Sequence, residues 1–123
     1  MEIPDLRVLL VEDDPSFRLL CRVTLELDGF TVLEAGTLAS ARAAVPDAHV
    51  VLLDLNVGFE DGRTLLREVK QLDEGPAVVI LSGSELDEEA VALADGLVTK
   101  PFGPGELAAA VLRAARVESA PAE

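Results

Sequence analysis

Short runs of apolar, mostly branched residues recur along the chain, each followed by polar or turn-forming residues. Three nearly continuous runs, at 6–11, 49–53 and 77–81, are typical of parallel strands that are covered on both faces, and a shorter run lies at 97–99. Residues 30–35 instead alternate between apolar and polar positions, which favours an edge strand. The pattern predicts five strands.

Stretches with helical spacing separate these strands. In the first, Asp14 can cap a helix that has Pro15 at its first position and that ends at Gly29. The spacing predicts an inward face made of Phe17, Leu20, Val23, Thr24 and Leu27.

Four further helices are predicted, over residues 37–45, 61–72, 85–94 and 104–117. In the third helix of the chain, Leu65, Leu66, Val69 and Leu72 are spaced for one face. In the fourth, Ser84 precedes the helix and Asp87 follows three residues later, as in a capping box. In the last, Leu107, Val111 and Ala114 or Ala115 face inward.

A strand followed by a helix therefore occurs five times, with short connections. This alternation predicts an α/β fold with a doubly wound parallel sheet and right-handed crossovers. The flavodoxin-like strand order 2-1-3-4-5 is a common solution for five such units. One domain is expected over residues 1–117, with 118–123 as a disordered tail or the start of a linker.

Polar residues follow four of the five predicted strands, at the point where each strand ends. Ligands of such sheets bind beyond the carboxyl ends of the strands, so these residues are expected to share one crevice. Each has an ordinary explanation when taken singly: a helix cap for Asp14, a turn cap for Ser82, a surface position for Lys100 and a satisfied buried carboxylate for Asp54. The full set is Glu12, Asp13, Asp14, Asp54, Ser82, Gly83 and Lys100.

Several carboxylates at one rim are tolerable if they share a hard divalent cation. Mg²⁺ takes oxygen ligands, keeps several waters and usually binds through one or two carboxylates plus a phosphate. We expect Asp13 and Asp54 as direct ligands, with Glu12 acting mainly through water.

The neighbouring groups suit an anion beside that metal. Lys100 supplies a point charge, Ser82 a hydroxyl donor, and the small Gly83 leaves its backbone N–H approachable. Metal, cation and donors around a carboxylate describe a phosphoryl-transfer site with Asp54 as the nucleophile.

Composition narrows the function further. The net charge of −13 over 123 residues argues against binding nucleic acid. Cys21, the single cysteine, rules out an internal disulfide and is expected to be a small buried side chain. No apolar stretch is long enough to span a membrane and no secretory signal is evident, so a cytoplasmic location is expected. Tryptophan and tyrosine are absent, which disfavours flavin and single-stranded nucleic acid sites.

From Leu6 to about Val117 the chain resembles the receiver domain of two-component response regulators. The resemblance rests on motifs that fall at the predicted strand ends and on an Asp-Gly pair at 61–62. These are "LLVEDDP", "LLDLN", "DG", "LSG" and "KPF", in this order along the chain.

The resemblance implies a role for each matching residue. Asp54 would be the phosphoacceptor, and Glu12 and Asp13 the acidic pair, with Asp13 as a direct Mg²⁺ ligand. The backbone carbonyl of Asn56 would complete the metal site. Ser82 and Lys100 would contact the phosphoryl group.

The resemblance also implies roles around this centre. Asn56 and Ser84 would tune the lifetime of the acyl phosphate. A cis peptide bond would precede Pro101. Leu97 occupies the switch position, where relatives usually carry Tyr or Phe.

Two other differences from the family pattern concern loop lengths and turns. The segment between Ser82 and Lys100 is several residues shorter than usual, which predicts a shortened fourth helix. Gly58 stands where proline is common.

The resemblance implies a switch that takes phosphoryl from a histidine kinase or a histidine phosphotransfer protein and alters a protein-binding surface. The alternative is a pseudo-receiver that binds protein without phosphorylation. An enzyme is disfavoured, because related hydrolases place a second aspartate two residues after the nucleophile, where this chain has Asn56. The downstream partner, a phosphorylation-dependent homodimer and an attached effector domain all remain open.

Overall fold

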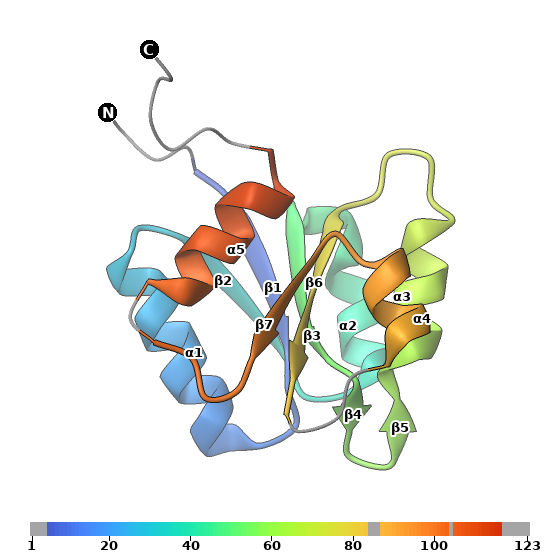
Figure 1. The fold of residues 1–123 in the computed structure, drawn as a ribbon, viewed down its shortest axis with the longest axis horizontal. Helices are drawn as coiled ribbons and strands as arrows, with labels where there is room; N and C mark the ends of the chain where they lie inside the picture. Colours follow the sequence, from blue (N-terminus) through green and yellow to red (C-terminus); the bar gives the residue numbers. More distant parts are fainter. Residues whose placement is uncertain (1–4, 84–86, 104, 117–123) are drawn as a thin grey trace.

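The structure, a computed structural model, describes residues 5–83, 87–103 and 105–116. Its centre is a five-stranded parallel sheet with the order β2-β1-β3-β6-β7 (Figure 1). These strands are β1 (Arg7–Val11), β2 (Thr31–Ala35), β3 (Val50–Asp54), β6 (Ala77–Ser82) and β7 (Gly96–Thr99). The predicted order 2-1-3-4-5 is confirmed, and the alternating segment β2 lies at an edge as predicted.

Helices cover both faces of the sheet. On one face lie α1 (Pro15–Leu27) and α5 (Glu106–Ala114), and on the other lie α2 (Leu38–Ala44), α3 (Gly62–Lys70) and α4 (Glu88–Leu93) (Figure 1). A 3-10 turn, η1 (Val45–Asp47), follows α2. A short antiparallel pair, β4 (Asn56–Val57) and β5 (Glu60–Asp61), follows β3 and was not predicted from the sequence.

Two hydrophobic cores result, one on each side of the sheet. In β1, Val8 and Leu10 face the α1/α5 side, whereas Leu9 and Val11 face the α2/α3/α4 side. All four are fully buried. Their alternation explains why the run is continuously apolar, because each face of the strand needs its own apolar set.

The predicted inward face of α1 is correct at Phe17, which packs against the core, but wrong at Leu20, Val23 and Leu27. Leu20, Val23 and Leu27 are 54%, 42% and 82% exposed, whereas Cys21 and Leu25 are fully buried. The helix carries two adjacent apolar rows. The sheet covers only the row that contains Cys21 and Leu25, which are four residues apart and therefore lie on the same face of the helix. The cap was correct: the Asp14 side chain accepts a hydrogen bond from the backbone N–H of Ser16 at 3.0 Å, with Pro15 at the start of the helix. The prediction of a buried Cys21 is also confirmed.

The remaining helices differ from prediction mainly at their ends. Because α3 ends at Lys70, Leu72 lies outside it and is 51% exposed rather than on its inner face. Asp87 is itself the N-cap of α4, since its side chain accepts from the backbone N–H of Ala90 at 3.1 Å. The proposed start of this helix at Ser84 lies outside the described residues.

The predicted shortening of the fourth helix is visible, because α4 has only six residues. The inward positions Leu107, Val111 and Ala114 of α5 are confirmed. The predicted tail at 118–123 is outside the described residues. Within the described part of the chain, no helix is long and apolar enough to cross a membrane.

Candidate functional site

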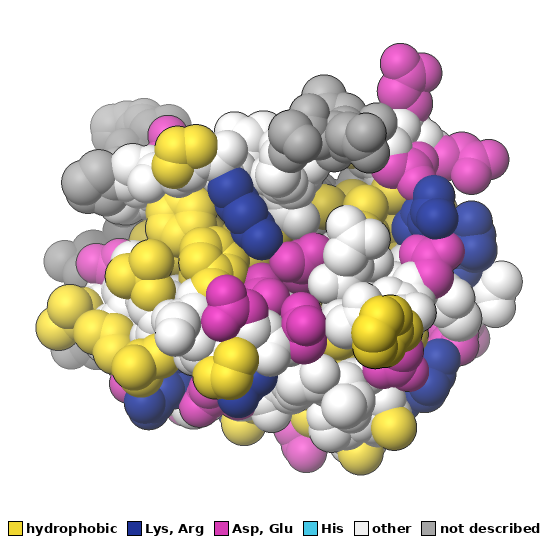
Figure 2. Space-filling model, turned by 90° about the horizontal axis from the view of Figure 1, so that it is seen from below, with side chains coloured by type: hydrophobic (Ala, Val, Ile, Leu, Met, Phe, Trp, Pro, Cys, Tyr) yellow, Lys and Arg dark blue, Asp and Glu magenta, His cyan; other side chains and the backbone are white. Residues whose placement is uncertain are grey.

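The carboxyl ends of β3, β6 and β7 meet at a cavity of about 570 Å³ at one edge of the sheet. Figure 2 looks onto this edge and shows acidic side chains gathered near its centre, beside a band of hydrophobic ones. Residues that line the cavity include Asp54, Asn56, Ser82, Gly83 and Lys100. The structure thus brings together side chains that the sequence placed after three separate strands.

Asp54 ends β3, and its carboxylate is held from two sides. One oxygen, Oδ1, accepts a hydrogen bond from the backbone N–H of Asn56 at 2.8 Å. The other, Oδ2, accepts from the Lys100 ammonium at 3.0 Å. These two hydrogen bonds fix the orientation of the carboxylate. The side chain is 13% exposed and lines the cavity, so a ligand in the cavity can reach it.

Glu12 directly follows β1 and is almost fully buried, with 3% of its surface exposed. Its Oε2 accepts from the backbone N–H of Asp14 at 3.1 Å. Its Oε1 lies 3.7 Å from Lys100 Nζ and has no hydrogen-bond partner among the described residues. Burial, and then the adjoining Asp54 carboxylate, raise the pKa of Glu12 to about 7.

Lys100 connects the two acids to the rest of the fold. Its backbone N–H donates to the Ser82 carbonyl at 2.8 Å, which aligns the end of β7 with the end of β6. Its ammonium lies 4.4 Å from the centre of the Phe17 ring at the start of α1, a cation–π contact. Burial works against the charged form, but the hydrogen bond and charge of Asp54, together with Glu12, keep the pKa of Lys100 above its ordinary value. The peptide bond between Lys100 and Pro101 is cis, as the resemblance implied.

Asp13 and Asn56 lie at the rim and are exposed. Asp13 reaches toward the β4–β5 turn, where a Cβ at Gly58 would be 3.9 Å from its Oδ2. Among the described residues, no three acidic, histidine or cysteine side chains are close enough to hold a metal by themselves.

The donor set nevertheless suits Mg²⁺. This ion usually takes one or two carboxylates and completes its shell with water and phosphate oxygens. The buried Oε1 of Glu12, which has no hydrogen-bond partner among the described residues, is an oxygen that could accept from a water bound to such an ion.

The Asp-Gly pair at 61–62 lies at the start of α3, next to the end of the strand that carries Asp54. The Asp61 side chain caps α3 by accepting from the backbone N–H of Arg63 at 3.0 Å. A Cβ at Gly62 would lie 2.7 Å from the Asp54 carbonyl oxygen, closer than real Cβ atoms come. Only glycine therefore lets α3 begin directly against the end of β3.

Other residues of interest lie elsewhere. Leu97 is half-buried in β7 and lines a separate hollow beside α5. Ser84 is outside the described residues. Asp14 caps α1, which was its ordinary explanation. The sequence analysis missed Arg63, which lines the same cavity as Asp54, because its contacts with a distant segment leave no local pattern.

Comparison with known proteins places the chain in one family. The response regulator receiver domain matches residues 8–112. KdpE of Escherichia coli, the KDP operon transcriptional regulatory protein, is 38% identical over 118 residues, which are 92% of this chain and 52% of that protein. AruR, a transcriptional regulatory protein of Pseudomonas aeruginosa, is 37% identical over 111 residues, which are 82% of this chain and 46% of that protein. The chain therefore spans about half the length of these relatives.

Solved structures agree with the sequence relatives. The receiver domain of NtrX from Brucella abortus superposes with a TM-score of 0.81 at 29% identity, covering 90% of this chain and 99% of that one. The chemotaxis protein CheY4 of Vibrio cholerae gives 0.79 at 25% identity, covering 89% and 98%. The chain belongs to the receiver domains of two-component response regulators, a family of signalling domains rather than enzymes.

Proposed function

We propose that Asp54 accepts a phosphoryl group from a histidine kinase or a histidine phosphotransfer protein, in a Mg²⁺-dependent reaction that switches a protein-binding surface. The observation that carries the proposal is the Asp54 carboxylate, held between the Lys100 ammonium and the Asn56 N–H at the wall of an open cavity. An Asp54 oxygen would form a bond to phosphorus as the bond from phosphorus to the donor nitrogen breaks. The electron pair of that bond stays on the donor imidazole.

The surrounding residues have separate tasks. Lys100 compensates the charge of the phosphoryl oxygens, while the Ser82 hydroxyl and the Gly83 N–H would donate to them from the end of the neighbouring strand β6. Asp13, Asp54 and the Asn56 carbonyl would hold Mg²⁺, with Glu12 acting through water. When bound, the metal would offset the negative charge that these carboxylates and the phosphoryl group concentrate at this edge.

Exposed apolar residues near the cavity support a protein as the donor. An exposed row along α1 consists of Leu19, Leu20, Val23 and Leu27, each of which is 42% or more exposed. The helix begins beside the cavity, since its Phe17 contacts Lys100. We assign this row to the phosphodonor protein.

Phosphorylation is tested by incubating the chain with Mg²⁺ and a small acyl phosphate and measuring the intact mass. The wild type should gain one phosphoryl group and Asp54→Ala should gain none. No gain on the wild type, or an equal gain on Asp54→Ala, would contradict the proposal.

The assignment of the exposed row on α1 to the phosphodonor protein is tested with Leu20→Ser. This variant should slow transfer from a protein donor about tenfold and leave phosphorylation by the acyl phosphate unchanged. Leu72→Ser is the matched control, because Leu72 is 51% exposed and Leu20 is 54% exposed. Equal effects of the two variants would refute the assignment of the row.

A pseudo-receiver that binds protein without phosphorylation is the second candidate. The six-residue α4 and the absence of an aromatic residue at Leu97 favour it. The retention of Asp54, Ser82 and Lys100 around one cavity favours phosphorylation instead. The named relatives are transcriptional regulatory proteins about twice as long, which supports control of an effector outside these residues.

A further inference from the structure

Arg63 joins two carboxylates at the edge of the cavity that contains Asp54. Its guanidinium binds Asp61 through Nε at 2.9 Å from Oδ1 and Nη2 at 2.9 Å from Oδ2. Its Nη1 donates to Asp87 Oδ2 at 2.7 Å. All three residues line that cavity, so the link is exposed to whatever occupies it.

Each of the two carboxylates also begins a helix. Asp61 is the N-cap of α3, and Asp87 is the N-cap of α4. Arg63 therefore connects the starts of two neighbouring helices, and it does so at the cavity that contains Asp54. The contact holds together segments that are 24 residues apart.

The two helix starts are not equally fixed. The start of α3 is packed against the acceptor strand, since Gly62 lies against the Asp54 carbonyl and its N–H donates to the Leu55 carbonyl at 2.7 Å. By contrast, Ala90 is the one buried residue within α4. The link therefore holds α4 to a fixed point.

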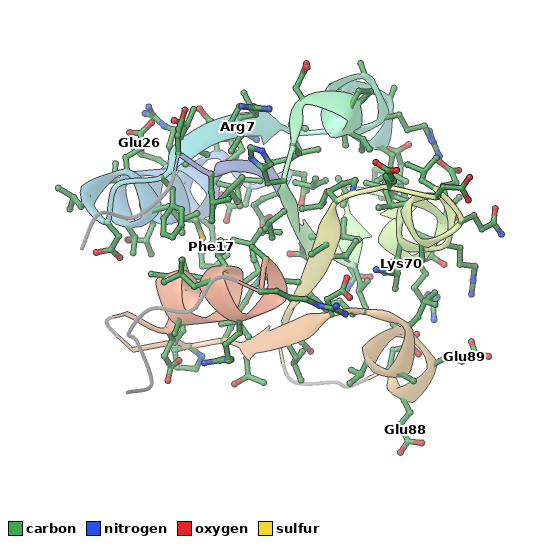
Figure 3. The ribbon with its side chains drawn as sticks, turned by 90° about the horizontal axis from the view of Figure 1, so that it is seen from above. Arg7, Phe17, Glu26, Lys70, Glu88 and Glu89 are labelled. Atoms are coloured by element: carbon green, nitrogen blue, oxygen red, sulfur yellow. The ribbon has the colours of Figure 1, made fainter. Side chains whose placement is uncertain are left out.

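The far end of α4 has its own anchor. Asp95, just after the helix, accepts from the Lys70 ammonium at 2.6 Å and from the backbone N–H of Val78 at 2.8 Å. Figure 3 shows Glu88 and Glu89 directed away from the sheet, so these two side chains do not tie the start of α4 to the core. With its end fixed at Asp95, α4 has at its start the 2.7 Å contact of Asp87 with Arg63 and the longer, 3.9 Å contact of Glu89 with Arg67.

We propose that Arg63 is a positioning residue that latches the start of α4 to the start of α3 while Asp54 is unphosphorylated, and that a phosphoryl group on Asp54 loosens this latch. The inference rests on the proposed phosphorylation of Asp54. Phosphorylation changes the charge of the Asp54 side chain from −1 to about −2 and brings three phosphoryl oxygens into the same cavity. It repels the Asp87 carboxylate and so weakens the contact between Asp87 and Arg63, while the two-pronged contact of Arg63 with Asp61 is retained.

The latch makes a prediction about the affinity of the cavity for a phosphoryl mimic. The latch stabilises the conformation in which the cavity holds no phosphoryl group. Breaking the latch must therefore strengthen the binding of any group that favours the conformation in which α4 is released. Beryllofluoride with saturating Mg²⁺ is the probe, and calorimetric titration gives its apparent dissociation constant. Arg63→Gln and Asp87→Asn should each tighten binding about two- to fivefold, the range expected for an exposed ion pair. The double variant should show no further gain, because both changes break one contact.

Two features keep the test specific. Asparagine is also a good N-cap, so Asp87→Asn removes the charge while α4 keeps its cap. Arg67→Gln removes an arginine one helical turn further along, whose contact with Glu89 is 3.9 Å long and exposed, and should leave the affinity unchanged. Amide exchange over α4 should be faster in both latch variants and in the wild type bound to beryllofluoride than in the free wild type.

Each other outcome overturns the latch. If Arg63 acted only through its charge on the cavity, Arg63→Gln would weaken binding and Asp87→Asn would strengthen it, so the two changes would have opposite signs. If Arg63 were a purely structural clamp, neither change would tighten binding. A wild type that fails to bind beryllofluoride refutes the proposed function and the latch with it, whereas a wild type that binds beside unaffected variants refutes the latch alone.

Discussion

Replacing Glu12 by glutamine should stabilise the protein in the absence of divalent cations, and should do so more at high pH than at low pH. The Glu12 carboxyl is buried, one of its oxygens lacks a hydrogen-bond partner among the described residues, and Asp54 adjoins it. Its pKa is therefore raised from 4.5 to about 7 in the native state. Glutamine keeps the size and removes the charge.

The sign and size follow from proton linkage. Between pH 4.5 and about 7 the native state retains a proton that the unfolded chain has released, so the free energy of unfolding falls as the pH rises through this window. At 1.36 kcal/mol per pH unit the full penalty is about 3 kcal/mol above pH 7, of which about 1 kcal/mol is present at pH 5. The advantage of Glu12→Gln over the wild type should therefore grow by about 2 kcal/mol between pH 5 and pH 8.

Urea unfolding with EDTA, followed by far-ultraviolet circular dichroism, measures this difference at both pH values. Dichroism is the suitable signal because the chain has neither tryptophan nor tyrosine. Glu74→Gln, which removes an exposed carboxylate, controls for the net charge of −13 and should show no such growth. If the gain in the free energy of unfolding on replacing Glu12 by glutamine were the same at pH 5 and pH 8, the interpretation of Glu12 as a buried acid with a raised pKa would be refuted.

Two further outcomes are expected. Saturating Mg²⁺ should raise the melting temperature, because it binds the native state alone. Asp13→Asn should lose most of that gain, whereas Asp73→Asn, which changes an exposed residue in the turn after α3, should keep it. Equal gains in the two variants would count against Asp13 as a ligand. Gly62→Ala should destabilise the fold by about 1–3 kcal/mol in urea unfolding, because its methyl would press on the Asp54 carbonyl. Gly83→Ala, whose methyl would meet no atom of the described residues within 4 Å, should change stability by less than about 0.5 kcal/mol, and equal losses would refute the packing argument.

Much of the fold could be predicted because strand burial leaves a direct mark on the sequence. The part of a strand that is covered on both faces must be apolar at successive positions, and residues 8–11 of β1, 50–53 of β3 and 77–81 of β6 are. The site was predictable for a related reason. Parallel strands end at one edge, so polar residues that follow successive strands are brought to the same place whatever the details of packing.

The orientation of α1 could not be predicted in the same way. Its sequence carries two apolar rows, and nothing local states which of them the sheet covers. Burial of Cys21 and Leu25, and exposure of Leu20 and Leu27, follow from how the helix packs against the sheet and α5. The row left outside is the one that we assign to a phosphodonor.

By itself the sequence determined the five strands of the sheet, the helix cap at Asp14 and the set of residues at the carboxyl edge, because these depend on local periodicity and on parallel strands all ending at one edge. Only the tertiary structure decided that Glu12 is buried with no hydrogen-bond partner for one oxygen among the described residues, and that Arg63 reaches Asp87. Both depend on distances between segments that are far apart in the chain. Such distances are set by the packing of whole helices against the sheet, which no short stretch of sequence encodes.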